Sequence, residues 1–151
     1  MRRRYACVGL SQHAAEKKLG VERVDAYHTA LTPLESELPL RHDTPPPHGH
    51  HAAYLKVVVD TGCPPTTRCI VCQCQRHACV AEDFDRVVGI HMVAPAASEA
   101  IQGFALAMKK GLYKRDLDLL VGVHPTVTEA FMNGSLEITK SSGKDPKSKG
   151  C

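Results

Sequence analysis

The sequence has few aromatic residues and no apolar run long enough to span a membrane. None of the 151 residues is tryptophan, and aromatic residues make up only 5% of the chain. A membrane-spanning helix needs about 20 consecutive apolar residues, so we expect no membrane association. The opening MRRR is too short for a targeting peptide, and the YACVGL after it is not an adequate signal core. We therefore expect an intracellular protein.

Neither sign of charge dominates the composition. The 19 basic and 16 acidic side chains give a net charge of +3, and the basic residues gather mainly at the two ends. This balance is weak evidence for nucleic-acid binding, and we expect no nucleic-acid partner. The sequence also has no internal repeat and no glycine-rich loop for a nucleotide phosphate. A hydrophobic content of 43% is enough for a packed core, which suits one domain or part of a larger enzyme.

Strand and helix patterns follow one another without strict alternation. Alternating or β-branched segments predict strands at residues 5–10, 21–31, 54–60, 86–95 and 135–140. Apolar spacing and terminal residues predict helices at residues 12–19, 96–110, 114–120 and 126–132. Ser11 is a suitable cap for the first helix, and Gly111 suits the position just past the longest one. This order predicts an α+β fold, a mainly antiparallel sheet with helices packed on it.

The chain contains seven cysteines but no secretion signal. They are Cys7, Cys63, Cys69, Cys72, Cys74, Cys79 and Cys151. An odd number in this context argues against a disulfide scaffold and leaves metal binding or redox chemistry. Cys7 lies in a strand pattern, and we predict that it is a small core residue.

Four of these cysteines lie within eleven residues, together with one histidine. The pattern is Cys69-x2-Cys72-x-Cys74-x4-Cys79, with His77 inside it and Cys63 before it. Thiolates and imidazoles bind tetrahedral zinc, but a second CxxC pair is missing, so a surface insertion of accidental composition is favoured over a zinc site. The CIVC motif also suggests thioredoxin-type redox chemistry, although no helix start follows it to lower a thiolate pKa. We therefore assign no metal ligand.

Histidines occur in a proline-rich loop and in two of the predicted strands. The loop holds His42, His48, His50 and His51 beside three consecutive prolines. This composition favours a linker over a metal site. His28 and His91 lie in strand patterns, and we expect ordinary half-buried side chains there rather than ligands.

The stretch GVHPTVTEAF, at residues 122–131, has two interpretations. Pro125 and Glu129 suit the first turn of a helix. Alternatively, His124 is an acid-base group held by the carboxylate of Glu129. At the end of the chain, Cys151 follows a polar, lysine-rich tail, which is equally compatible with a reactive thiol and with an inert last residue.

Several motifs, taken in order, resemble one protein family. The set is Tyr5-x3-Gly9-Leu10-Ser11, Tyr27-His28, Pro33-Leu34-Glu35, RVVGIHMVAPAASEAIQGFALAMKKGL, LVGVHPTVTEAF and LEITKSSGKDPKSKGC. This set resembles the C-terminal interface domain of high-molecular-weight thioredoxin reductases. In chain order, the motifs resemble the opening strand, the long helix, the histidine motif and the C-terminal arm of that domain. The related glutathione reductases share the histidine motif but lack the arm, so Gly150-Cys151 favours thioredoxin reductase.

The resemblance implies a particular chemistry. Members of this family are homodimeric flavoproteins in which NADPH reduces FAD and FAD reduces a neighbouring dithiol. By match, His124 is the acid-base group for the dithiol of the partner subunit, and Glu129 orients its imidazole. The resemblance also places His124 and Pro125 among the cofactor-binding residues and the long helix in the dimer interface. The C-terminal arm, with Cys151, is expected to carry electrons to thioredoxin.

The resemblance also implies a domain organisation. Residues 1–139 are expected to form the interface domain, with loop insertions at about 38–53 and 61–85, and residues 140–151 a flexible redox arm truncated at a selenocysteine codon. FAD and NADP are expected to bind through domains absent from this chain, so the chain alone is expected to be inactive. The expected compartment is the cytoplasm or the mitochondrion. The alternatives are an interface domain of glutathione reductase and a free-standing zinc-binding or dimerisation module.

Overall fold

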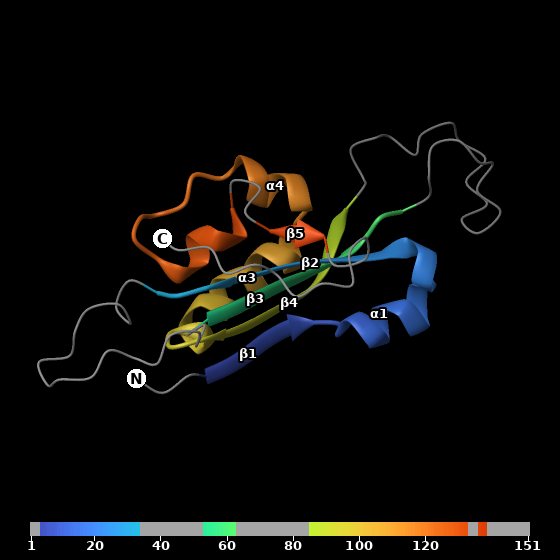
Figure 1. Ribbon diagram of the computed structural model, residues 1–151. Coiled ribbons are helices and arrows are strands. Elements are labelled where there is room, and N and C mark those ends of the chain that lie inside the picture. Colours follow the sequence, from blue (N-terminus) through green and yellow to red (C-terminus); the bar gives the residue numbers. More distant parts are fainter. Residues whose placement is uncertain (1–3, 34–52, 63–84, 133–135, 139–151) are drawn as a thin grey trace, which may run out of the picture.

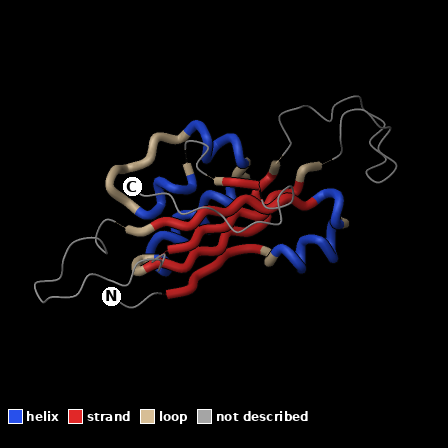
Figure 2. Tube along the Cα trace, viewed as in Figure 1, coloured by secondary structure: helices blue, strands red, loops and turns tan. Residues whose placement is uncertain are grey.

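A five-stranded antiparallel sheet forms the centre of the fold (Figures 1 and 2). The computed structural model describes residues 4–33, 53–62, 85–132 and 136–138. In sheet order the strands are β1 (Arg4–Gly9), β4 (Arg86–Ala94), β3 (Ala53–Asp60), β2 (Val24–Leu31) and β5 (Glu137–Ile138). Neighbouring strands all run antiparallel. The predicted α+β class, with a mainly antiparallel sheet, is confirmed.

The central strand β3 is buried on both of its faces. Val57 and Val59 belong to the main hydrophobic core, whereas Val58 belongs to a smaller cluster on the opposite face. All three valines are fully buried. Successive side chains of a strand point to opposite faces, so helices must cover both sides of the sheet at β3.

The main core lies between the sheet and a layer of three helices. The longest, α3 (Ala97–Lys110), packs on β1 and β4. The short helices α4 (Lys114–Leu119) and η3 (Val127–Phe131) follow it, and η3 contacts β2 and β3. The rings of Phe104 and Phe131 meet edge to face, with centroids 4.9 Å apart, and join α3 to η3.

The opposite face of the sheet is covered in part by α1 (Gln12–Leu19). The hydroxyl of Ser11 accepts a hydrogen bond from the backbone N–H of Ala14 at 3.2 Å, as expected for the predicted cap. Ala15 is fully buried in the smaller cluster with Val58. Lys56, on β3, donates to Oε1 of Gln12 at 2.6 Å, and burial lowers the pKa of this lysine.

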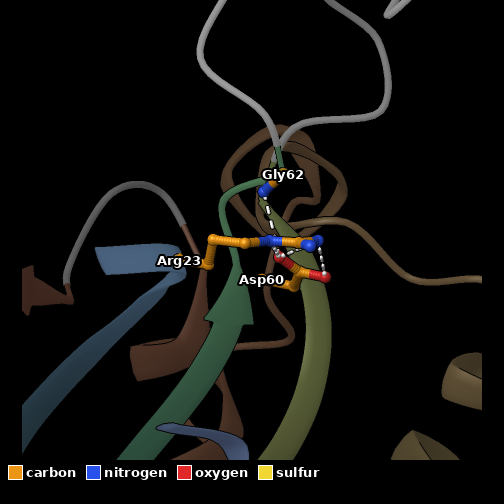
Figure 3. Close-up of polar contacts among 3 residues, drawn as sticks. All are labelled: Arg23, Asp60 and Gly62. Carbon is orange, nitrogen blue, oxygen red and sulfur yellow. Dashed lines mark hydrogen bonds and ion pairs between the residues drawn. The ribbon is translucent and has the colours of Figure 1, made fainter. Parts of the chain in front are cut away.

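The sequence predicted a strand from residue 21, but the strand begins later. The structure has a short 3-10 helix, η1 (Val21–Arg23), before β2. Arg23 makes a two-pronged contact with Asp60 at the end of β3: its Nη2 lies 2.9 Å from both carboxylate oxygens (Figure 3). The backbone N–H of Gly62 donates to the same carboxylate at 3.0 Å. This ion pair therefore ties η1 to the point where the chain leaves β3.

The prediction that Cys7 is a core residue is wrong. Cys7 is exposed. The cause is the alternation of side chains along β1: Ala6 and Val8 pack against the main core, so Cys7 points to the other face. Because β1 is an edge strand and α1 packs on β2 and β3, the thiol of Cys7 stays uncovered.

Two predicted elements near the end of the described chain have different forms. The segment predicted as an α-helix at 126–132 is the five-residue 3-10 helix η3. Of the strand predicted at 135–140, the described part forms β5, which pairs with Tyr27 and His28 of β2.

In the described parts of the chain, no helix combines the length and apolar character needed to cross a membrane.

A buried lysine anchors α4 to the sheet. Lys114 forms an ion pair with Asp118 one turn later, and its ammonium lies 4.9 Å from the centre of the Tyr27 ring. Leu117 on the same helix is fully buried in the core. Burial, together with the charges of Asp85, Asp25 and Asp118, raises the pKa of Tyr27 to about 12.

We predict opposite effects on stability for two glycine substitutions. A Cβ at Gly89 would lie 2.0 Å from the carbonyl oxygen of Leu10, whereas a Cβ at Gly103 in α3 has no atom within 4 Å. Gly89→Ala should therefore lower the free energy of unfolding by about 1–3 kcal/mol through overpacking. Gly103→Ala should raise it by up to about 1 kcal/mol, because alanine is the better helix former. Urea denaturation of the two variants measures both, and changes of the same sign would contradict the packing described.

We also predict that Tyr27 makes the fold sensitive to alkaline pH. The folded chain keeps the phenol proton up to a pKa of about 12, while the unfolded chain loses it near 10. Between these pH values the unfolded state binds fewer protons than the folded state. The free energy of unfolding should therefore fall as the pH rises through this range. Tyr27→Phe should flatten this decline in thermal midpoint, whereas Tyr113→Phe, the matched control, should not. Equal slopes in the parent and Tyr27→Phe would exclude Tyr27 as the cause.

Candidate functional site

The structure brings His124 and Glu129 together at the surface. Nδ1 of His124 lies 3.2 Å from both carboxylate oxygens of Glu129. The histidine side chain is 73% exposed and the glutamate side chain 29%. A carboxylate only accepts hydrogen bonds, so Nδ1 must carry the proton in this contact. Nε2 is then available for proton exchange with a group outside the pair.

Glu129 is held by the core, although its partner is exposed. It lies in η3, where Phe131 is fully buried and Met132 is also buried. The N–H of Met132 donates to the carbonyl of Glu129 at 2.9 Å and closes the helix. The backbone that carries Glu129 is therefore anchored in the core, and its carboxylate contacts the imidazole from this side.

Gly122 lets the chain that carries His124 approach η3 closely. A Cβ at this position would lie 2.5 Å from Cβ of Glu129 and 3.0 Å from its Cα. No side chain fits in that space without a shift of the glutamate or of the loop. Two residues later the chain reaches His124, whose peptide bond to Pro125 is cis. The sequence motif alone gave no sign of this role for Gly122.

The end of α4 and the residues that lead from it to His124 expose an unusual amount of apolar surface. The exposed fractions are 81% for Leu119, 50% for Leu120, 83% for Val121 and 74% for Val123. We call this stretch the apolar segment 119–123. The sequence of this segment, LLVGV, is apolar throughout, and large apolar side chains are most often buried. Its exposure is visible only in the structure.

Two histidines in strand patterns were predicted to be half-buried: His91 is, whereas His28 is buried. Nδ1 of His28, which is buried, lies 2.8 Å from the hydroxyl of Tyr54. Nδ1 of His91 lies 2.8 Å from the hydroxyl of Tyr5, and its Nε2 donates to the carbonyl of Leu10 at 3.0 Å. Within the described ranges, no three His, Cys, Asp or Glu side chains are grouped so that they could hold a metal ion.

Several predicted features lie outside the described residues. These are the cysteine-rich stretch 63–79 with His77, the histidine loop 42–51, nearly all of the two expected insertions, and the arm that ends at Cys151. Their roles stay predictions from the sequence. The described candidate site is thus the pair His124 and Glu129, with Pro125 and Gly122 beside it.

Comparisons with known proteins identify the family to which this domain is similar. The family model of the pyridine nucleotide-disulphide oxidoreductase dimerisation domain matches residues 75–134, which include α3, α4, the apolar segment 119–123 and the His124–Glu129 pair. The chain is 34% identical over 147 residues to thioredoxin reductase SEP1 of Emiliania huxleyi, which covers 97% of this chain and 24% of that protein. It is 33% identical over 150 residues to mitochondrial thioredoxin reductase 2 of Drosophila melanogaster, covering 97% of this chain and 23% of that protein.

The chain thus spans about a quarter of the length of these two relatives. The matched family model, the near-complete alignment of this chain and the antiparallel α+β fold all agree. The chain belongs to the pyridine nucleotide-disulphide oxidoreductase family, as a dimerisation domain of the thioredoxin reductase type.

Proposed function

We propose that this chain is the dimerisation part of an NADPH- and FAD-dependent thioredoxin-disulfide reductase. In this proposal His124 and Glu129 form the acid-base pair for a dithiol of the partner subunit. The observation that carries it is the contact between Nδ1 of His124 and the carboxylate of Glu129, with the imidazole exposed. An acid-base group that faces outward from its own fold is suited to a reaction on another subunit.

The geometry suits proton transfer in thiol-disulfide exchange. Exchange needs a thiolate as the attacking group and a protonated thiol as the leaving group. With Nδ1–H bound to Glu129, Nε2 of a neutral His124 takes the proton of the attacking thiol. The thiolate then attacks the disulfide sulfur, and the imidazolium returns the proton to the departing sulfur. The negative charge of Glu129 stabilises the imidazolium between these two steps.

We propose that the main cofactor-binding domains belong to other parts of the enzyme. This chain has no glycine-rich loop for a dinucleotide phosphate. We assign both cofactors to the remainder of a longer subunit. His124 and Pro125 would border the cofactor-bearing side of the partner subunit, because both are exposed.

The substrate and the arm are part of the same proposal. Both relatives named above are called thioredoxin reductases, which supports thioredoxin as the substrate of the complete enzyme. We propose that Cys151 belongs to the redox arm that delivers electrons to it, and that the complete enzyme is a selenoprotein. We propose the cytoplasm or the mitochondrion as the compartment. The Drosophila relative is named as a mitochondrial protein, which is compatible with the mitochondrion.

A hybrid subunit provides the test system. Residues 4–138 of this chain replace the corresponding segment of the Drosophila relative, whose remaining parts supply the cofactor-binding domains and its own C-terminal end. The unaltered hybrid should reduce thioredoxin with NADPH. If the purified hybrid folds and binds flavin but does not turn over, the proposed function fails.

We predict that His124→Ala lowers turnover of the hybrid by about 10²–10⁴-fold, the usual loss for a general acid-base group. Glu129→Gln should cost less, about 10–100-fold, because the imidazole loses its orienting partner but stays in place. Steady-state rates with thioredoxin measure both effects. His13→Ala, in the exposed part of α1, is the matched control and should leave the rate unchanged. A near-normal rate for His124→Ala would remove this residue from the mechanism.

A further inference from the structure

Cys7 lies on an open face of the sheet with a histidine and a tyrosine beside it. The strand register places Cys7 directly opposite His91 of β4. Tyr5, two residues before Cys7 on β1, points to the same face. Cys7 and Tyr5 are both exposed. This face is opposite to the main core, so the group lies on the other side of the sheet from η3, which carries Glu129.

The hydrogen bonds of His91 fix the direction of proton donation in this group. A carbonyl oxygen only accepts, so Nε2 of His91 carries the proton in its contact with Leu10 at 3.0 Å. In the neutral imidazole Nδ1 is then an acceptor, and it takes a hydrogen bond from the hydroxyl of Tyr5 at 2.8 Å. The lone pairs of the Tyr5 hydroxyl are therefore left for a second donor.

Cys7 is the second partner of this hydroxyl. A side-chain hydrogen bond with Cys7 is the largest cause that raises the pKa of Tyr5, with smaller contributions from burial and from the charge of Cys7. The hydroxyl thus keeps its proton beside the sulfur, where it can accept from a thiol or donate to a thiolate. The three side chains form a continuous path from Sγ of Cys7 through Tyr5 to Nδ1 of His91. A proton that leaves the sulfur can be held by the imidazole and returned along this path.

We propose that Cys7 is a thiol that reacts with hydroperoxides, and that Tyr5 and His91 relay its proton. The sulfur attacks the terminal oxygen of the hydroperoxide, so that an S–O bond forms and the O–O bond breaks. The thiol proton passes through Tyr5 to His91 and returns to the departing oxygen. The products are the sulfenic acid of Cys7 and an alcohol, or water when the oxidant is hydrogen peroxide. Sulfur is oxidised and the peroxide is reduced, and the inference does not depend on the proposed function.

The leaving group identifies the class of oxidant. A thiol has a pKa of about 8.5, so a thiolate leaves a disulfide readily without a proton. Water has a pKa of about 15.7, so the oxygen that departs from a peroxide needs a proton far more. A path that takes the proton from the sulfur and returns it beside the same sulfur therefore suits a hydroperoxide better than a small disulfide.

Chemical labelling of the full 151-residue chain tests the proposal. Trypsin cleavage after Arg4 and Lys17 releases YACVGLSQHAAEK, in which Cys7 is the single cysteine. Hydrogen peroxide is added together with dimedone, which traps sulfenic acids, and the mass of this peptide gives the rate of oxidation. Iodoacetamide gives a second rate for the same sulfur, with iodide as a leaving group that needs no proton. The ratio of the two rates cancels changes in the exposure or ionisation of the thiol.

We predict that Tyr5→Phe lowers this ratio by roughly 10–100-fold. This is at the low end of general acid-base effects, because water can partly replace the relay at an exposed site. His91→Gln should lower the ratio in the same direction. The matched control is Tyr54→Phe. Tyr54 lies on the same face, and its hydroxyl contacts Nδ1 of His28 at 2.8 Å, but it belongs to β3 and not to the strand of the thiol. Its ratio should equal that of the parent.

Each other outcome overturns the proposal. An unchanged ratio in Tyr5→Phe would remove the relay, and because Tyr5 is exposed, this variant should fold even if His91→Gln does not. An equal fall in the Tyr54→Phe control would mean a general effect of the surface. A Cys7 that iodoacetamide labels but peroxide does not oxidise would exclude the hydroperoxide, and a Cys7 that neither reagent reaches would exclude the site. None of these rates depends on turnover, so the proposed function is tested separately.

Discussion

Burial of β3 on both faces is the constraint on which the other elements depend. One face requires the layer of α3 and η3, joined by Phe104 and Phe131, and the other requires α1. Apolar burial is the main driving force of folding, and here it also sets the path of the chain. From α3 the chain continues through α4, where Lys114 is buried, and passes His124 at the surface before Phe131 and Met132 enter the core.

The candidate site combines a fixed group with an exposed one. Glu129 belongs to a helix whose end is buried, whereas His124 lies on a surface segment that touches this helix through Gly122. A catalytic histidine needs a defined orientation and access to its substrate at the same time. The contact with Glu129 can orient the imidazole from one side, and the other side of the imidazole is left exposed.

The sequence predicted the elements that depend on local patterns. The apolar spacing of α3 and the Ser11 cap of α1 gave their bounds to within a residue, and the resemblance indicated the pairing of His124 with Glu129. Cys7 was placed in the core because alternation along a strand does not tell which face is covered; that depends on where α1 and α3 pack. The exposure of LLVGV and the contact of Gly122 with Glu129 also depend on how the chain packs, and not on a local sequence pattern. Both were therefore visible only in the structure.

The central claim is that His124 acts on the partner subunit and not on its own. Mixed dimers test this directly: hybrid subunits with His124→Ala are combined with hybrid subunits whose flavin-adjacent cysteines are replaced by serine. Each parent is expected to be nearly inactive, but a mixed dimer contains one complete site. The account predicts that random mixing restores roughly a quarter of the activity of the unaltered hybrid, since half of the dimers are mixed and each has one working site. Mixtures with no more activity than the parents would contradict it.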